Sequence, residues 1–276
     1  MKKTIILGVA PVSHNLPKEC RCGISAETVS QDVIACAAQG ASVVHLHVRD
    51  QLGQQTDDLT EYDKTLRLIR KSTDIVIQGS TGGLSTLTLE ERCVSVNHPL
   101  TETASLNIGS VNFGETAYIN TLPDIRFWAA HMLEQKVAAE MEIFDLSMLE
   151  TARMLYDHGL IKHFVFNLGL GFPSALPANE HYLRIMRDEF SRFDGAVWGV
   201  IHHQMNNLEL LQKAVELGAD MIRVGFEDSV FIRDGVIARN NAEAVAEAVK
   251  MLRSIGCEVA TPEYARKKLK VLKPYS

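Results

Sequence analysis

The sequence predicts a (β/α)8 barrel, in which eight parallel strands close into a cylinder and a helix follows each strand. Three observations support this fold. Short apolar runs alternate with helix-period segments along the whole chain. The chain has 276 residues, 46% of them hydrophobic, which is enough to bury one large core. The first apolar run leads into "GVAPVSHN", which lacks the glycine-rich phosphate turn of an open doubly wound sheet, the alternative fold. We therefore expect a single barrel domain over residues 1–276.

The elements follow from the alternation of apolar runs and amphipathic segments. The strands are expected at residues 4–10, 42–48, 74–80, 103–109, 138–145, 163–169, 195–201 and 220–226. The helices are expected at residues 25–38, 60–71, 88–96, 124–136, 147–158, 180–190, 207–217 and 241–254. Ser25 is a predicted N-cap of the first helix, and "LGAD" at 217–220 is typical of a helix end that leads into a strand.

Composition argues against several classes of function. The net charge is -6 and no long basic run is present, so nucleic acid is a poor candidate partner. The basic tail "YARKKLKVLKPYS" is expected to be a solvated helix face and terminus. No apolar run approaches the ~20 residues that span a bilayer. The short apolar run after "MKK" suits a first strand better than a signal peptide, so we expect a cytoplasmic protein. The five cysteines lack zinc-ribbon spacing and are interpreted as thiols.

The second strand, "SVVHLHV", carries two histidines on one face. Side chains of a strand alternate between its faces, so His45 and His47 point one way while Val44, Leu46 and Val48 point the other. The apolar face packs on helices, which leaves both imidazoles inside the barrel. Two histidines at this spacing suit one metal ion; the alternative is a pair of hydrogen-bonded core histidines.

The eighth strand, "DMIRVGFED", carries charges on the same interior face. Ile222 and Val224 face helices, so Arg223 and Glu227 face inward. Buried charges are costly unless they are paired or bind a ligand. The second and eighth strands both flank the first, so His45, His47 and Glu227 are expected to form a metal site with open positions for substrate. A structural Arg223–Glu227 ion pair is the alternative.

Other strand ends add polar groups by the same alternation. These candidates are Ser80, Thr81 and Gly82 after the third strand, Ser105 and Asn107 in the fourth, and Glu140 and Glu142 in the fifth. Such side chains line the mouth of a barrel, where active sites of this fold lie. The "IHHQ" segment, residues 201–204, offers His202 and His203 as metal ligands, but a solvent-exposed loop is the favoured interpretation.

Several segments together resemble one enzyme family, the β-keto acid cleavage enzymes, whose founding activity is 3-keto-5-aminohexanoate cleavage. The segments are "GASVVHLHVRDQLGQ", "IQGSTGG", "SLNIGSVNFG", "EMEIFD", "IRVGFED" and the closing "NNAEAVAEAVKMLRSIGCEVATPEYAR". The resemblance implies a zinc-bearing barrel, commonly a homotetramer. It also implies a reaction in which a β-keto acid and acetyl-CoA give acetoacetate and a new acyl-CoA by a retro-Claisen route.

The resemblance also implies roles for individual residues. Zinc would be held by His45, His47 and Glu227, and would stabilise charge on the keto oxygen as a Lewis acid. Asp228 would act as a base positioned by Arg223, with the acetyl-CoA methyl as the expected proton donor. The resemblance further implies that Glu142 lies near the chemistry, and that the residues in contact with substrate are Ser13, Ser80, Thr81, Gly82, Ser105 and Asn107.

One position departs from the family pattern. The founding enzyme has an acidic residue near the end of the first strand, where it meets the amino group of its substrate. This chain has Ser13 there, with His14 beside it. The resemblance therefore predicts a neutral or differently polar β-keto acid. The alternative functions are a metal-dependent barrel hydrolase or lyase that does not use CoA, and a barrel without catalytic activity.

Overall fold

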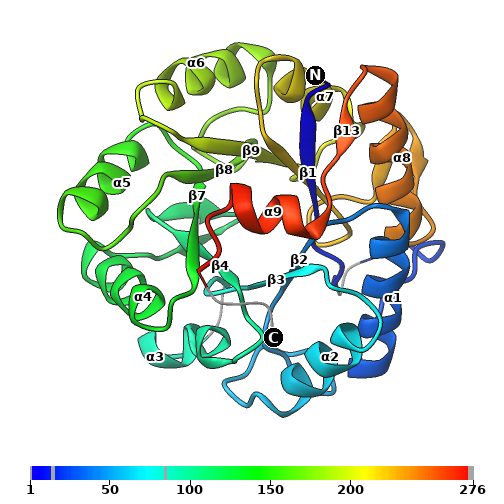
Figure 1. Cartoon of the computed structure of the whole chain (residues 1–276), viewed down its shortest axis with the longest axis horizontal. Coiled ribbons are helices and arrows are strands. Elements are labelled where there is room, and N and C mark those ends of the chain that lie inside the picture. Colours follow the sequence, from blue (N-terminus) through cyan, green and yellow to red (C-terminus); the bar gives the residue numbers. More distant parts are fainter. Residues whose placement is uncertain (1, 14–15, 84–85, 273–276) are drawn as a thin grey trace.

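The computed structural model describes residues 2–13, 16–83 and 86–272. Within these residues, eight parallel strands pair in sequence order, and the last pairs with the first to close a barrel (Figure 1). The strands are β1 (Thr4–Val9), β2 (Val43–Leu46), β3 (Val76–Gly79), β4 (Thr103–Asn107), β7 (Ala138–Ile143), β8 (Val165–Gly169), β9 (Val197–Ile201) and β10 (Met221–Val224). Closure joins Val9 of β1 to Val224 of β10 in register. The predicted barrel is confirmed.

Helices surround the barrel as an outer ring (Figure 1). They are α1 (Ala26–Gln39), α2 (Thr60–Arg70), α3 (Leu89–Arg92), α4 (Leu122–Glu134), α5 (Met148–Asp157), α6 (Glu180–Phe190), α7 (Glu209–Glu216) and α8 (Asn241–Ser254). The Ser25 hydroxyl accepts a hydrogen bond from the Thr28 amide, as the N-cap prediction requires. The helix expected at 88–96 is divided into α3 and a 3-10 turn, Val94–Asn97. The turn contains two β-branched valines, which favour helix less than unbranched residues do.

The interior of the barrel is layered. Its lowest layer is apolar and includes Ile6, Val43, Val76, Val165, Val197 and Met221. The next residue of the same parity is polar on several strands: His45, Gln78, Ser105, Glu140, Asn167 and Arg223, all of which are buried. Val44, Leu46 and Val48 instead join the large cluster between strands and helices. The predicted division of faces on the second strand is therefore confirmed.

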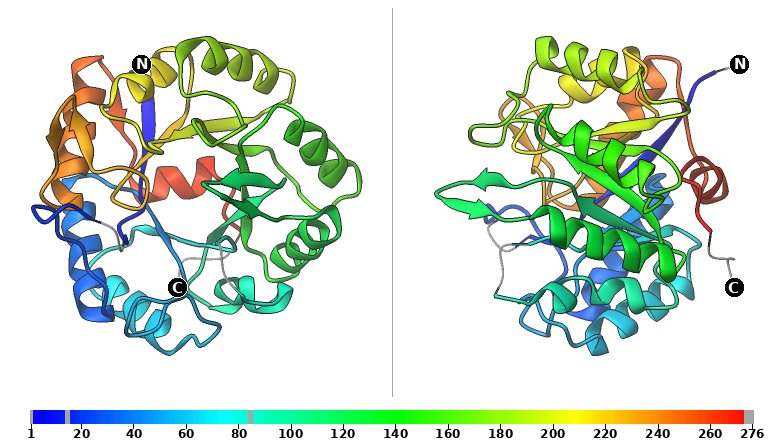
Figure 2. Two further views of the ribbon diagram at one scale, coloured as in Figure 1. Left: turned by 180° about the vertical axis from the view of Figure 1, so that it is seen from behind. Right: turned by 90° about the vertical axis from the view of Figure 1, so that its left-hand side faces the viewer.

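Five short strands, four of them in two hairpins, were not anticipated from the apolar pattern. Hairpins β5 (Val111–Phe113) with β6 (Thr116–Tyr118), and β11 (Phe231–Arg233) with β12 (Val236–Ile237), follow β4 and β10. β13 (Glu258–Val259) pairs with β1, and α9 (Pro262–Lys268) follows it. The β5–β6 hairpin projects at the barrel end opposite α9 (Figure 2). These short elements lack the long apolar runs on which the strand predictions depended.

Helix α9 covers the end of the barrel where the strands begin (Figure 1). Ala265 and Leu269 are buried against the lowest interior layer. Arg266 binds the buried Glu102, with Nε 2.5 Å from Oε2. The expectation of a helix in the basic tail is confirmed, but a wholly solvated face is wrong, because one side of α9 closes the barrel.

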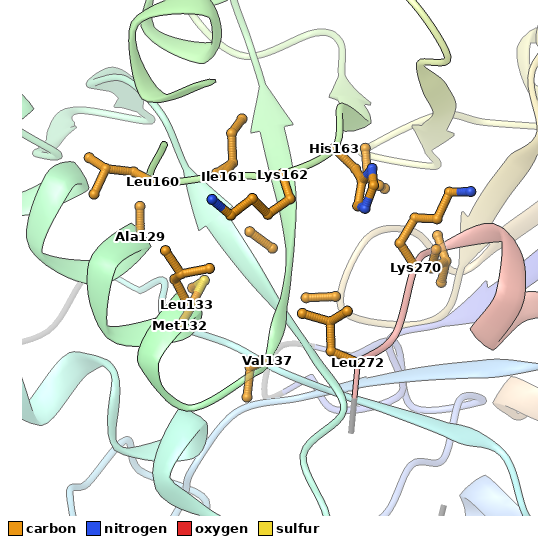
Figure 3. A pocket seen from close by; sticks show the side chains of 14 residues that line it. Ala129, Met132, Leu133, Val137, Leu160, Ile161, Lys162, His163, Lys270 and Leu272 are labelled. Atoms are coloured by element: carbon orange, nitrogen blue, oxygen red, sulfur yellow. The ribbon is translucent and has the colours of Figure 1, made fainter. Parts of the chain in front are cut away.

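A small cavity of about 40 Å³ lies at this same closed end. It is lined by apolar side chains of α4, of the segment before β8 and of the chain after α9, among them Met132, Ile161 and Leu272 (Figure 3). Lys162 and His163 lie at its edge (Figure 3). Among the described residues, no helix is both long enough and apolar enough to cross a membrane.

Candidate metal and active site

The carboxyl ends of the strands open into a large cavity of about 660 Å³. Its lining comes from β2, β7, β9 and β10, from the segments that follow these strands, from the segments that follow β3 and β8, and from the β5–β6 hairpin. The two predicted histidines lie in it, together with Arg223, Glu227 and Asp228. This is the end of the barrel at which (β/α)8 enzymes carry their active sites.

The predicted metal ligands converge in this cavity. Nε2 of His45 lies 3.5 Å from Oε1 of Glu227, and Nε2 of His47 lies 3.4 Å from the same oxygen. Each of the three residues offers one ligand atom, and these atoms all lie within 4.8 Å of one another. Two imidazole nitrogens and one carboxylate oxygen, with an open side toward a cavity, form a donor set that suits zinc or another divalent ion.

The other ring nitrogens of both histidines are occupied. Nδ1 of His45 lies 2.7 Å from Oε1 of Gln78, and Nδ1 of His47 lies 2.7 Å from the amide of Gln55. These contacts orient the rings so that both Nε2 atoms face Glu227. Burial lowers the pKa of His45 to about 3, so its imidazole is neutral, as a metal ligand must be. The residues therefore fit a metal ion.

A glycine lets the chain bring Glu227 to this point. Gly225 has φ of +127°, a conformation that favours glycine, and a Cβ atom there would lie 2.4 Å from the carbonyl oxygen of Ala10. The close approach allows the Glu227 amide to donate to that carbonyl at 3.1 Å. The end of β10 is thus fixed against the end of β1, which places Glu227 beside the β2 histidines.

Arg223 is held by two carboxylates on its two sides. Its Nε and Nη2 donate to Asp228 at 2.9 and 2.8 Å, and its Nη1 donates to Glu142 at 3.1 Å. Glu227 is more distant, at 3.8 Å from Nη2. The anticipated Arg223–Glu227 ion pair is thus present only at long range, and the main partners of Arg223 are Asp228, bound by two hydrogen bonds, and Glu142.

These charged side chains are buried, and burial shifts the pKa values of the carboxyl groups. Burial raises the pKa of Glu142 to about 7, although Arg223 opposes the shift. Burial also raises the pKa of Asp228 against the same opposing charge. Burial works against the charge of Glu227 too, but His47, His45 and Arg223 hold its pKa well below the usual range. The site thus places a carboxylate that stays ionised beside two that bind protons more readily.

The predicted substrate-contacting residues fall into two groups. Ser80 and Gly82 line the cavity, and the Gly82 amide donates to the Ser80 hydroxyl at 3.0 Å. Thr81, Ser105 and Asn107 are buried directly behind this edge without lining it. Among the described residues, the Ser105 hydroxyl and the Asn107 amide oxygen have no hydrogen-bond partner, although both are buried.

Ser13 lies apart from the cavity lining and is partly buried. Its carbonyl oxygen accepts a hydrogen bond from the Cys22 thiol at 3.2 Å. His14 lies outside the described residues. Glu140 is buried one layer below the cavity and accepts a hydrogen bond from Asn167 at 2.8 Å.

The expectation of a solvent-exposed loop at "IHHQ" is wrong. His202 and His203 are 1% and 8% exposed. His202 donates from Nε2 to the carbonyl of Asn207 at 2.7 Å, and His203 stacks on Phe172 with ring centroids 3.8 Å apart. The strand alternation, extended beyond β9, would have placed His203 on the interior face with Val197, Gly199 and Ile201.

One side of the cavity is aromatic, and the sequence did not predict it. Phe113, Tyr118, Phe144 and Phe172 all line it. They lie in hairpins and loops beyond the strand ends, where alternation no longer indicates direction. Gln55, which touches His47, was missed for the same reason.

Comparison with known proteins agrees with this site. Residues 11–271 match the family described as beta-keto acid cleavage enzyme. The chain is 32% identical to the 3-keto-5-aminohexanoate cleavage enzyme of Fusobacterium nucleatum over 281 residues, covering 99% of this chain and 100% of that protein. It is 31% identical to the 3-oxoadipate:acetyl-CoA acetyltransferase of Cupriavidus necator over 275 residues, covering 96% and 94%.

A solved structure described as a binary complex of ObcA with oxaloacetate shares the fold, with a TM-score of 0.74 and 20% identity. The match covers 90% of this chain and 67% of that one. The fold likeness and the full-length sequence matches agree with each other and with the earlier resemblance. The chain is a member of the beta-keto acid cleavage enzyme family.

Proposed function

We propose that the protein is a zinc-dependent transferase that converts a β-keto acid and acetyl-CoA into acetoacetate and a new acyl-CoA. The observation that carries the proposal is the His45–His47–Glu227 set beside the Arg223–Asp228 pair, in a chain that belongs to this family. Family members carry names that specify acetyl-CoA as the second substrate, as the Cupriavidus necator relative does.

The carbon skeletons of the products fix which bonds change. Acetoacetate contains C1 and C2 of the β-keto acid and the acetyl group of acetyl-CoA. C2 must therefore lose a proton and bond to the thioester carbonyl carbon, with release of the CoA thiolate. The thiolate then attacks the C3 ketone carbon and the C2–C3 bond breaks, which gives acyl-CoA and the acetoacetate carbanion that recovers a proton. Deprotonation of the acetyl-CoA methyl, expected from the sequence, does not give acetoacetate and is replaced.

Different residues of the chain serve different steps of this reaction. His45, His47 and Glu227 would hold the zinc ion, which would supply a Lewis acid for the oxygens of the substrate. Asp228 takes the C2 proton and later returns it, and Arg223 fixes the Asp228 carboxylate with two hydrogen bonds. Glu142 accepts a hydrogen bond from the remaining guanidinium nitrogen, Nη1, and keeps the group in place. Ser80 and Gly82 form the edge toward which the substrate carboxylate points, and Thr81, Ser105 and Asn107 are buried behind it.

The test is an acetoacetate-release assay on zinc-loaded protein with a panel of β-keto acids, with and without acetyl-CoA. Release that requires acetyl-CoA, with formation of an equal amount of a new acyl-CoA, is the expected result. The Asp228→Asn variant should lose about 100-fold or more in rate while it keeps its bound metal. Cleavage that proceeds equally without acetyl-CoA would instead support the hydrolase or lyase alternative.

A homotetramer is the proposed assembly and rests on the family resemblance. Light scattering of the purified protein tests it directly, since a chain of 30.6 kDa should then give a particle of four times that mass. A monomer at micromolar concentration contradicts this part of the proposal without affecting the reaction.

A further inference from the structure

One side of the cavity is a continuous aromatic surface, here called the aromatic wall and defined as Phe113, Phe144, Phe172 and His203. Phe144, Phe172 and His203 follow β7, β8 and β9, and Phe113 reaches over them from β5. The metal ligands lie on β2 and after β10. The cavity therefore has a polar half that carries the chemistry and an apolar half made from other strands.

The rings of the aromatic wall are packed on one another. His203 and Phe172 stack face to face, with centroids 3.8 Å apart and planes 7° apart. Phe144 meets Phe172 at 4.6 Å and 64°, and Phe113 meets Phe172 at 5.6 Å. Phe144, Phe172 and His203 are each less than 10% exposed, so they form a preformed surface, while Phe113 remains 42% exposed at the rim.

The local backbone is built to hold this packing. A Cβ atom at Gly169 would lie 2.8 Å from the Phe144 ring and 3.1 Å from the Phe172 ring, so glycine makes room for both. The Phe144 carbonyl accepts from the Leu176 amide at 3.1 Å, and the Gly171 amide donates to the Leu176 carbonyl at 2.8 Å. The loop after β8 is thereby fastened to the end of β7, and Phe172 is carried with it.

The described carboxylates of the cavity already have partners. Glu142 and Asp228 bind Arg223, and Glu227 faces both histidines. His203 adds no positive charge at neutral pH, because burial and the nearby Arg223 lower its pKa to about 4. A charged group laid against the aromatic wall would lose water without gaining an ion pair there. For an ammonium group, attraction to the phenyl faces returns about 0.5–2 kcal/mol, less than the several kcal/mol that removal of a charge from water costs.

We propose that the aromatic wall binds the part of the β-keto acid beyond its C3 ketone, and that this part is uncharged and apolar, a branched alkyl or aryl group. The inference rests on the proposed function, since it assumes that the polar half takes the carboxylate and the ketone. It makes Phe172 and His203 the residues that determine specificity. Transfer of such a group out of water stabilises the complex in proportion to its apolar area.

A matched pair of substrates tests the inference. 5-Methyl-3-oxohexanoate and 3-keto-5-aminohexanoate have the same shape, but a methyl group in the first replaces the ammonium group of the second. We expect kcat/KM for the methyl compound to be higher by about 10- to 100-fold. Isothermal titration of zinc-loaded protein with each acid, in the absence of acetyl-CoA, should give the same order of Kd without any turnover.

Variants test whether the aromatic wall causes the discrimination between the two acids. Phe172→Ala and His203→Ala should each remove most of this discrimination and leave KM for acetyl-CoA unchanged. The matched control is a second stacked phenylalanine–histidine pair, Phe127 and His131, on the outside of α4. Phe127→Ala and His131→Ala should leave the discrimination as it is in the unmodified protein. Far-ultraviolet circular dichroism checks that each variant is folded.

The outcomes separate the two proposals. Absence of acetoacetate release from every acid would contradict the proposed function, and the titration would still decide the inference. Equal or tighter binding of the ammonium compound would overturn the inference while the reaction stands. A rise in KM for acetyl-CoA alone in Phe172→Ala and His203→Ala would also overturn it, because the wall would then belong to the CoA site.

Discussion

The two ends of the barrel are built from the same strands but differ in what their interior side chains do. At the closed end, an apolar layer packs on α9 around a cavity of about 40 Å³. At the open end, histidines, carboxylates and Arg223 converge on a cavity of about 660 Å³. Within one strand, β2, the change occurs over two positions, from Val43 to His45. The structure therefore separates stability from chemistry along the barrel axis.

Both ends contain a buried arginine–carboxylate cluster, and the clusters are organised differently. At the closed end, one carboxylate, Glu102, lies between Arg70 and Arg266, with two contacts of 2.5 Å. At the open end, one arginine, Arg223, lies among carboxylates that burial makes easier to protonate. The first arrangement fastens three segments together, and the second keeps groups ready to exchange protons.

The largest expected effect is loss of the metal ligands at the open end. His47→Ala or Glu227→Gln should lower the rate by about 1,000-fold, since a metal contributes several kcal/mol to stabilising the charge that develops in the reaction. Metal content, measured by inductively coupled plasma mass spectrometry, should fall with the rate. The control is His163→Ala at the closed end, which should retain metal and activity (Figure 3). A metal-free His47→Ala protein with full activity would contradict the site assignment.

The next effect concerns the closed end. Glu102→Ala leaves two arginines without their shared carboxylate, so the free energy of unfolding should fall by about 3–5 kcal/mol. The rate per folded molecule should not change. Urea unfolding measures the loss, and Glu180→Ala, which breaks an exposed pair with Arg184, should cost less than about 0.5 kcal/mol. Similar losses in the two variants would show that the Glu102 cluster does not fasten the barrel.

A smaller effect is expected from the residue that orients His45. Gln78→Leu removes the acceptor 2.7 Å from Nδ1 of His45 and should weaken metal affinity by about 10- to 100-fold. Competition with a metal chelator gives the affinity. Gln212→Leu, a similar change on the exposed face of α7, serves as the control. Unchanged affinity in Gln78→Leu would mean that the ring is held by its packing alone.

The most gradual effect is the dependence of stability on pH. The pKa of Glu142 is about 7 in the folded protein and 4.5 as the ordinary value. Between these values the folded state holds a proton that the unfolded chain has released, so the free energy of unfolding should fall as pH rises from 4.5 to about 7. Urea unfolding of metal-free protein across this range measures the slope, and Glu142→Gln should reduce it. A slope that is the same in both proteins would contradict the assignment to Glu142.

The sequence was most informative where strand alternation applies. His45, His47 and Arg223 lie within or next to regular strands, so their direction followed from the apolar residues between them. Glu227 lies just beyond β10, and the alternation still predicted its inward direction correctly. The third strand ends at Gly79, and for Ser80–Gly82 the sequence predicted the neighbourhood of the cavity but not which residue lines it.

The aromatic wall and the closed end were beyond the same reasoning. Phe144, Phe172 and His203 meet only because three successive loops converge, which is a property of closure rather than of any one segment. Likewise, the contact of Arg266 with Glu102 joins residues 164 positions apart. The sequence of a short basic helix shows only its charges, and the buried partner, Glu102, lies far away in the sequence, just before β4.

The pairing of β1 with β10 also sets an order of events during synthesis. On a ribosome, Thr4–Val9 emerges long before Met221–Val224, its neighbour on one side, or Glu258–Val259 at its edge. At about 5–20 residues per second, the strand waits roughly 10–40 seconds for the partner that closes the cylinder. Ile5, Leu7 and Val9 are fully buried in the finished protein, so during this interval an apolar edge remains open to other chains. The nascent protein should therefore depend on chaperone protection until Met221–Val224 has emerged and paired with Thr4–Val9.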